Sequence, residues 1–266
     1  MTASLGRIWA VALNAFREAV RNRVLYGVVA LVLIFNLMAV VVGALSITEQ
    51  ARVARDLGLA GTSIGGGLTA IVIGVSLLYT EVQKRTIYAI ISKPLARWEF
   101  VVGKYLGMAL VLTVLVGLFT LAMVAMLSYR GVAVAGAVGQ AVVLTWCEVL
   151  VVAAIAVFFS SFSSPFLSGL FALALWLIGR LTPDLRAAVA TSEAGWIDAV
   201  SSATLAVVPD LHLFSVSGRA VDGHHVSVNG DFVGWGYVST AAVHGALWIA
   251  GLLVLASLIF RRRDFV

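Results

Sequence analysis

The sequence predicts an all-α integral membrane protein with six transmembrane helices, an N-terminal helix in the membrane interface and a short helix in one cytoplasmic loop. Hydrophobic residues make up 61% of the 266 residues and charged residues only 12%, which is about half the charged share of a soluble domain. One soluble core cannot hide so much apolar surface, so the composition excludes a soluble enzyme and a disordered chain. The basic residues flank the apolar runs, as they do in membrane proteins.

The gaps between charged residues predict the six spans. Each gap can hold a helix of about 20 residues, the length that crosses the hydrocarbon. The stretch from Gly131 to Gly179 contains one charge, Glu148. It is too long for one span, and the turn-forming cluster Ser160–Pro165 divides it. The predicted spans are Val24–Thr48, Leu57–Thr80, Tyr105–Tyr129, Gly136–Phe159, Phe166–Gly179 and Phe232–Phe260.

The distribution of Lys and Arg predicts the orientation. With six spans, twelve of the 18 basic residues lie on the side of the two termini and six on the other side. Because cytoplasmic loops carry the excess of Lys and Arg, both termini are expected in the cytoplasm. We expect one transmembrane domain over 1–266: an interfacial helix in 1–23, five spans in 24–180, an extracytoplasmic segment in 181–235, the last span in 236–260 and a cytoplasmic tail in 261–266.

The first 23 residues have the pattern of an amphipathic helix. Apolar side chains between Leu5 and Val20 recur at helical spacing and include Trp9 and Phe16, which favours a helix lying in the membrane interface. The polar residues predicted on the opposite face are Arg7, Asn14, Arg17, Glu18 and Arg21. This helix is either a simple anchor for the first span or an elbow that moves with a cytoplasmic partner, and the two roles are compatible.

The loop Glu81–Lys104 between the second and third spans is the most specific segment. A short apolar stripe at helical spacing precedes Pro94, which ends the helix, and Lys104 is expected to extend to the membrane surface at the start of the third span. A short helix presented to the cytoplasm can be gripped by a soluble partner. The stripe consists of Val82, Ile87, Ile90 and Ile91.

Residues in this loop resemble the signature of type 2 ATP-binding-cassette (ABC) export permeases. In that family, a Glu at the end of span two precedes a Gly-Thr pair, a turn ending in Pro, an Arg, and a Gly-Lys pair that opens span three. The ending Phe260–Phe265 and the Ser-Lys-Pro turn are most similar to the NosY-like branch, the multicopper-enzyme maturation permeases. Arg85 departs from the pattern, since the family has Gly there. The matching residues are Glu81, Thr86, Ser92-Lys93-Pro94, Arg97, Glu99-Phe100 and Gly103-Lys104.

The resemblance implies a permease subunit in the bacterial cytoplasmic (inner) membrane that is not itself an enzyme. Its partners would be two ABC ATPase subunits, which would bind ATP and magnesium, a second permease copy in a homodimer, and a periplasmic accessory protein. Glu81–Lys104 would be the coupling helix. The residues expected to contact the ATPase are Glu81, Arg85, Thr86, Ile87, Ile90, Lys93, Pro94 and Arg97, and those of the elbow helix are Arg17, Glu18 and Arg21.

The sequence supports a separate ATPase independently, because it contains no G-x-x-x-x-G-K-[ST] phosphate loop. The glycines Gly65–Gly67 are followed by Leu68-Thr69-Ala70, with no Lys to reach a phosphate. We expect them to loosen the start of the second span or to let another helix approach closely.

Glu148 is predicted at the middle of the fourth span. An ionisable group at that depth costs about 2.5 kcal/mol or more unless it faces protein or water. It either lies on the transport path or at the dimer seam, or it clasps another helix. The candidate partners for a clasp are Gln140, Asn36 and Thr113. The neighbouring Cys147 is expected to be a small packing residue.

The extracytoplasmic segment 181–235 holds most of the histidines. The part from Trp196 to Val208 is apolar enough for one or two helices on the outer surface, and 217–236 has the pattern of a loop or hairpin. The copper association of the resembling branch suggests a metal site, whereas the absence of helical ligand spacing favours solvated loop residues. No metal ligand is assigned. The residues in question are His212, His224 and His225, with Asp210 and Asp222.

Three classes of function compete at this point. The first is the permease of an ATP-driven exporter, and the second is a non-transporting anchor or mechanotransmission subunit acting on a periplasmic partner. The third is an intramembrane enzyme, but only His244 lies in a span, with no obvious catalytic partner. A nucleic-acid-binding module is excluded because the chain has no soluble basic domain. The spans suit a lipid-like molecule as well as a small sulfur or metal species.

Overall fold

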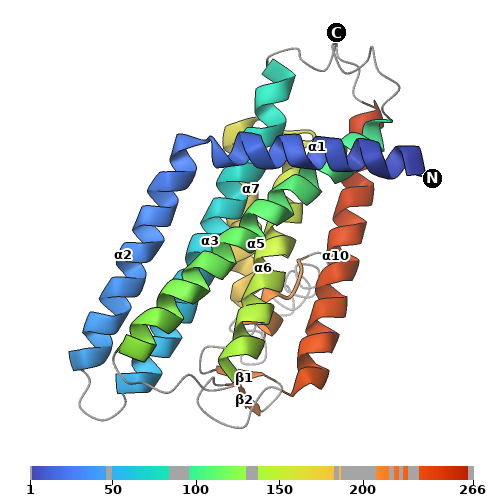
Figure 1. Cartoon of the computed structure of the whole chain (residues 1–266). Helices are drawn as coiled ribbons and strands as arrows, with labels where there is room; N and C mark the ends of the chain where they lie inside the picture. The colour runs from blue at the N-terminus through green and yellow to red at the C-terminus, as the bar shows by residue number, and fades with distance from the viewer. Residues whose placement is uncertain are drawn as a thin grey trace.

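The computed structural model of the chain is a bundle of helices crossed at one end by the N-terminal helix (Figure 1). It describes residues 2–45, 50–83, 96–129, 137–182, 186, 208–215, 219–221, 224–226 and 234–262. The helices are α1 (Thr2–Val20), α2 (Arg23–Leu45), α3 (Gln50–Gln83), α5 (Arg97–Tyr129), α6 (Ala137–Ser160), α7 (Pro165–Arg180), the 3₁₀ helix η1 (Leu211–Phe214) and α10 (Trp235–Arg262). Two short strands, β1 (Arg219–Val221) and β2 (His224–Val226), form an antiparallel hairpin.

Most of the described residues of each predicted apolar run lie in a helix, and the predicted break is confirmed. Residues 161–164 form a turn, and Pro165 occupies the first turn of α7, a position that needs no backbone N–H and suits the fixed φ of proline. Aromatic rings pack around this turn, with Phe158 edge-on to Phe159 and to Phe162 at 5.2 and 5.3 Å. The turn therefore reverses the chain between two antiparallel helices.

Four helices are long and apolar enough to cross a membrane: Arg55–Ser76 within α3, Arg97–Tyr129, Val138–Ser160 and Trp235–Phe260. A fifth candidate is the pair formed by α1 and α2, between which the chain bends by 66°. The remaining apolar helix, α7, has only 16 residues. The described residues thus contain four to five membrane-compatible spans, and the count of six stays a prediction.

The two ends of the bundle differ. At one end, here the α1 end, α1 lies across α5, and α10 also terminates there (Figure 1). The hairpin of β1 and β2 lies at the opposite end, here the hairpin end. The end of α3 at Gln83 and the start of α5 at Arg97 both lie at the α1 end (Figure 1), so the described residues on either side of the predicted coupling loop share that end with the predicted elbow helix.

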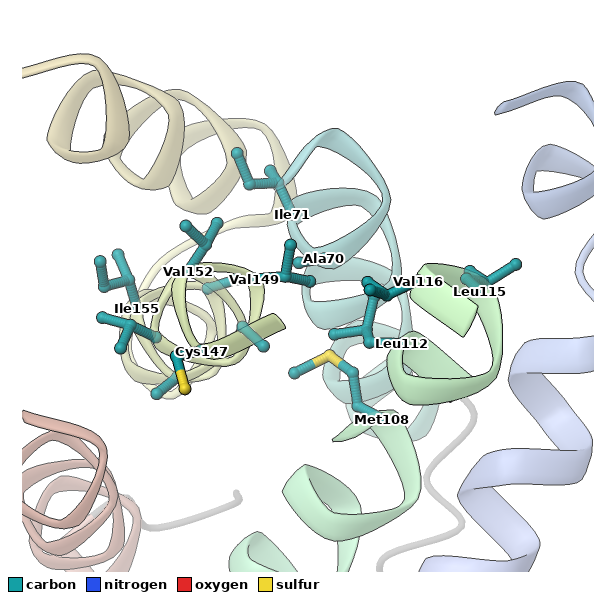
Figure 2. Packing of buried hydrophobic residues seen from close by; sticks show 14 of the residues in the cluster. Ala70, Ile71, Met108, Leu112, Leu115, Val116, Cys147, Val149, Val152 and Ile155 are labelled. Carbon is teal, nitrogen blue, oxygen red and sulfur yellow. The ribbon is translucent and has the colours of Figure 1, made fainter. Parts of the chain in front are cut away.

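The centre of the bundle is formed by α3 and α6. Figure 2 shows Val149 of α6 beside Ala70 of α3, with Met108 and Leu112 of α5 in the same core. All four side chains are fully buried. The run Val151–Val157 of α6 is buried on every side, as expected for a helix that is apolar all round.

The glycines Gly65–Gly67 let three helices approach α3. A Cβ at Gly65 would lie 2.0 Å from Val32 of α2, one at Gly66 would lie 2.6 Å from Val149 of α6, and one at Gly67 would lie 2.6 Å from Trp176 of α7. Successive residues on a helix point about 100° apart, so three adjacent glycines serve three neighbours. The close-approach interpretation is the one that the structure supports.

The segment after α7 corrects one expectation. His212, expected to be a solvated loop residue, is 5% exposed, and its neighbours Leu211 and Phe214 are 0% and 1% exposed. They pack against α6 and α7, and Phe214 also reaches Gly245 of α10. Apolar residues on both sides of His212 pull it into the bundle. The hairpin expected within 217–236 is confirmed, with Ala220 opposite His225, whereas 187–207 lie outside the described residues.

Candidate functional site

Glu148 forms the centre of a buried polar network. Its side chain lies halfway along α6 and is only 1% exposed. Carboxylate oxygen Oε2 accepts a hydrogen bond from the Ser63 hydroxyl at 2.6 Å, and Oε1 accepts one from the Trp176 indole N–H at 3.0 Å. Arg180 adds an ion pair, with Nε 2.8 Å from Oε1 and Nη2 3.3 Å from Oε2. Three helices, α3, α6 and α7, meet at this carboxylate.

The local sequence explains why these groups converge. Trp176 and Arg180 are four residues apart, so both project from one face of α7. The absence of a side chain at Gly67 lets the Trp176 ring reach α3. The guanidinium carbon of Arg180 lies 5.6 Å from the centre of that ring, where cation–π attraction stabilises the charge. The end of α7 is therefore held against α3 and α6 by polar contacts.

The network corrects the expected partners of Glu148. Asn36 and Thr113 donate to backbone carbonyls of their own helices, and Gln140 is not among the hydrogen-bond partners of this carboxylate. The counter-charge comes from Arg180, which the orientation argument counted only among the six basic residues on the side away from the termini. Its position four residues after a tryptophan, at the end of an apolar run, is the sequence signal that could have identified it.

A recess of about 340 Å³, counted with the space that opens out of it, lies beside this network. Apolar and polar groups share its wall, and α3, α6, α7 and the segment 208–215 all contribute. Such a mixed wall can hold the polar group of a small apolar molecule. The lining residues are Leu59, Ala60, Ser63, Thr145, Glu148, Arg180, Phe214 and Ser215.

A second region is the crossing of α1 over the first turns of α5. Gly103 and Gly107 face α1, and a Cβ at Gly107 would lie 2.3 Å from the carbonyl oxygen of Ala12 and 2.6 Å from the Cβ of Ala15. Both alanines are fully buried. Small residues four apart let two helix backbones approach closely, so α1 rests directly on the α5 backbone.

Glu99, in the first turn of α5, ties this helix to α1. Its carboxylate accepts hydrogen bonds from the Ser4 hydroxyl, from the Ala96 backbone N–H at 3.1 Å, and from Arg7 at 2.7 and 3.0 Å. The contact with Ala96 caps the start of α5, and the two-bond contact with Arg7 fixes the orientation of both side chains. Glu99 is 3% exposed and Arg7 is 39% exposed. The point where the chain enters α5 is thus joined to α1.

Two more contacts extend this junction. Lys104 Nζ lies 3.0 Å from Glu18 Oε2, and the Lys104 side chain is only 1% exposed. Lys104 was expected to extend to the membrane surface; it is buried between α1 and α5 instead, because Glu18 supplies the opposite charge. Arg97 Nη1 donates to the Phe260 carbonyl at 3.1 Å, and the Phe100 and Phe260 rings stack with centres 6.0 Å apart. The start of α5 therefore holds both α1 and the end of α10.

The residues of α1 take different roles from those its periodicity indicated. Arg7 and Glu18, predicted on the solvent-facing side, turn toward α5. Arg17 and Arg21 are exposed, as predicted. The apolar residues Leu5 and Trp9 are 65% and 57% exposed, so an apolar strip of α1 faces away from the bundle, as an interfacial helix requires.

Most of the predicted coupling helix lies outside the described residues. This applies to Arg85, Thr86, Ile87, Ile90, Lys93 and Pro94, and Glu81 lies in the last turn of α3 with a side chain that is not described. Their contact with an ATPase stays a prediction.

Of the histidines in the segment 181–235, only His212 has a side chain that the structure describes. The side chains of His224 and His225, and all of Asp222, are outside the described residues. Asp210 Oδ2 accepts a hydrogen bond from Arg186 Nη2 at 3.0 Å. His212, two residues further along the chain, is buried. Within the part of the chain that the structure describes, no three His, Cys, Asp or Glu side chains are close enough to hold a metal ion.

Comparison with known proteins assigns a family to this arrangement. The family model described as "ABC-2 family transporter protein" matches residues 9–265, nearly the whole chain. The match includes the Glu148 network and most of the junction between α1 and α5. A search of curated proteins finds no match.

Proposed function

The chain belongs to the ABC-2 family of transporter proteins, and we propose that it is the permease subunit of an ATP-driven exporter in the cytoplasmic membrane. The family accounts for the several apolar helices and implies an ABC ATPase as partner. Export as the direction, two ATPase copies, a second permease copy and the NosY-like branch belong to the proposal. ATP and magnesium would bind the ATPase and not this chain.

The observation that carries the proposal is the junction at the start of α5. The segment 84–95 leaves α3 and enters α5 at Arg97, so a displacement of this segment acts on the first turn of α5. Glu99 and Lys104 pair with α1 in that turn and the next, while Arg97 contacts the end of α10. A movement applied at one point would therefore reach three helices together.

The contact with the ATPase is assigned to the apolar stripe of the loop. Ile87 and Ile90 would fill a groove of the soluble partner in the helix-in-groove manner, and Pro94 would end the short helix. The basic residues Arg85 and Lys93 would flank that contact. Glu81, at the end of α3, and Arg17 and Arg21 of the elbow helix would adjoin it.

Two sets of variants test this division between binding and force transmission. Replacing Ile87 and Ile90 together by Asp should abolish co-purification of the ATPase, because unpaired charge would be buried in the groove. Glu99→Gln should retain the ATPase but lose the link between ATP turnover and movement of α1, since the ion pair with Arg7 is removed. Co-purification in detergent and ATP turnover in lipid are the two measurements.

The matched control for Glu99→Gln is Arg186→Gln. Arg186 forms an ion pair with Asp210, which involves neither α1 nor α5, and its side chain is 55% exposed. This variant removes one ion pair without touching α5, so its turnover should match that of the unmodified protein. If the double aspartate variant still retains its ATPase with normal turnover, the loop is only a tether and the coupling assignment is wrong.

One observation favours a second candidate, a mechanotransmission subunit that acts on a periplasmic partner. The segment 208–215 is packed into the bundle by Leu211 and Phe214, and the hairpin of β1 and β2 follows it closely in the chain. A movement of α6 or α7 would therefore reach the hairpin. Stimulation of ATP turnover by a periplasmic protein, with no substrate transported into inverted vesicles, would select this candidate over the exporter.

A further inference from the structure

In the polar network beside the recess, the acceptor positions of Glu148 are occupied, whereas some N–H donors of Arg180 are not. A carboxylate offers about four acceptor positions, and those of Glu148 are taken by the Ser63 hydroxyl, the Trp176 indole and two nitrogens of Arg180. Ser63 Oγ also accepts from Arg180 Nη2 at 2.6 Å. The acceptors of the network are therefore used within the protein.

Donors are left over. The guanidinium of Arg180 has five N–H groups, and its bonds run from Nε and Nη2. Among the described residues, Nη1 is in none of the hydrogen bonds of Arg180, and the Thr145 hydroxyl, which can donate or accept, lines the same recess. Both residues line the recess, and the Arg180 side chain is 25% exposed. The recess thus offers an occupant the unused N–H groups of Arg180 and a hydroxyl that can serve as donor or acceptor.

Charge narrows the choice of occupant. Glu148 already neutralises Arg180, so an added anion would leave the site with a net negative charge in a low-dielectric region, where uncompensated charge is costly. An uncharged acceptor, such as the carbonyl of an ester or amide, satisfies Nη1 without that cost. A cation finds no unused acceptor on Glu148. The site therefore favours a neutral group with a hydrogen-bond acceptor for Arg180.

The rest of the wall is apolar and is completed by the extracytoplasmic segment. Leu59 and Ala60 of α3 line one part, and Phe214, which is 1% exposed, comes from η1. A hydrocarbon tail can lie against these side chains, while the carbonyl reaches Arg180.

We propose that this recess is a binding site for an uncharged, carbonyl-bearing amphipathic molecule, held by Arg180 Nη1 and Thr145 Oγ1 with its apolar part against Leu59 and Phe214. Glu148 acts as a positioning residue, because it orients the guanidinium and takes up its other N–H groups. Only the description of this molecule as the exported substrate rests on the proposed function. The binding itself needs neither ATP nor the ATPase.

The test follows protection of a cysteine placed in the wall. Ala60→Cys, in a Cys147→Ser background, puts a thiol at the recess without removing a polar group. The full chain in dodecyl maltoside, a detergent without a carbonyl, is treated with N-ethylmaleimide in the presence of methyl decanoate, decane or decanoate. At a probe concentration ten times its Kd, mass action predicts that methyl decanoate slows labelling about tenfold. Decane should not slow it.

Two controls make the result specific. Ser239→Cys places a thiol at an exposed position of α10, and its labelling should be unaffected by any probe. Arg180→Lys, added to Ala60→Cys, keeps a positive charge beside Glu148 but lacks the second nitrogen of the guanidinium fork. The unprotected labelling rate should stay the same, and protection by methyl decanoate should fall to that by decane.

Three results would overturn the proposal. Equal protection by decane and methyl decanoate would mean that the recess only accommodates hydrocarbon, and stronger protection by decanoate would mean that the ligand is anionic. Full ester protection in Arg180→Lys would remove the role of Nη1. Because no ATPase is present, none of these results bears on the coupling assignment, whose own test is loss of co-purification.

Discussion

Replacing Gly107 with Ala should push α1 away from α5. The added Cβ would lie 2.3 Å from the Ala12 carbonyl oxygen and 2.6 Å from the Ala15 Cβ. Neither atom can swing aside, since one belongs to the backbone and the other is fixed directly to it. A carbon–oxygen contact normally lies at about 3.3 Å or more, so α1 must retreat by about 1 Å.

The cost follows from the packing that such a retreat disrupts. A gap of about 0.5–1 Å forfeits roughly a quarter to a half of the dispersion attraction at a contact, and overpacked sites lose about 1–3 kcal/mol. The ion pairs of Glu99 with Arg7 and of Lys104 with Glu18 flank this crossing and would lengthen together. Against this, Ala favours a helix interior over Gly by about 0.5–1 kcal/mol. The net loss should be on the order of 1–2 kcal/mol.

A matched substitution on the same helix isolates the clash. A Cβ at Gly117 of α5 meets nothing within 4 Å, so Gly117→Ala gains the same helix propensity without displacing a neighbour. Thermal unfolding of both variants, purified in one detergent and followed by intrinsic fluorescence, should give a lower apparent Tm for Gly107→Ala and an unchanged or higher one for Gly117→Ala. If Gly107→Ala unfolds at or above the temperature of Gly117→Ala, α1 does not rest on α5 as described.

Two further outcomes are expected. Cysteines at Lys93 and Asp222, each in a Cys147→Ser background, should react with an impermeant maleimide from opposite sides of the membrane; labelling of both from outside would contradict the six-span orientation. Glu148→Gln should lower the apparent Tm, because breaking a buried ion pair costs up to about 3–5 kcal/mol. The cost should be smaller here, since a quarter of the Arg180 side chain is exposed to solvent. Adding Arg180→Gln should recover part of that loss, and a double variant less stable than the single one would argue against the ion pair.

The sequence by itself determined the class of protein and the linear order of its helices. Runs without charge can be read directly, because a charged side chain in hydrocarbon is costly, and the observed helices match those runs closely. The break at Ser160–Pro165 was equally plain, since proline cannot continue a helix that begins before it. The glycines at 65–67 signalled close packing, although not which helices would approach.

Only the tertiary structure decided which residues meet. Arg180 is 32 positions from Glu148, and Ser63 is 85 positions from it. The central helix α6 is apolar all round, so no polar face in its sequence shows which neighbour each residue will oppose. Helix rotation, set by where Gly66 and Gly67 admit Val149 and Trp176, brings the three polar groups together.

The junction at the α1 end was hidden for a related reason. The periodicity of α1 separates apolar from polar side chains, and it placed Arg7 and Glu18 toward solvent because charged residues usually lie there. The structure buries part of that polar edge, since α5 presents Glu99 and Lys104 opposite it. A pattern within one helix indicates which side is apolar, but the charge of the facing helix decides whether a polar side chain meets water or a partner.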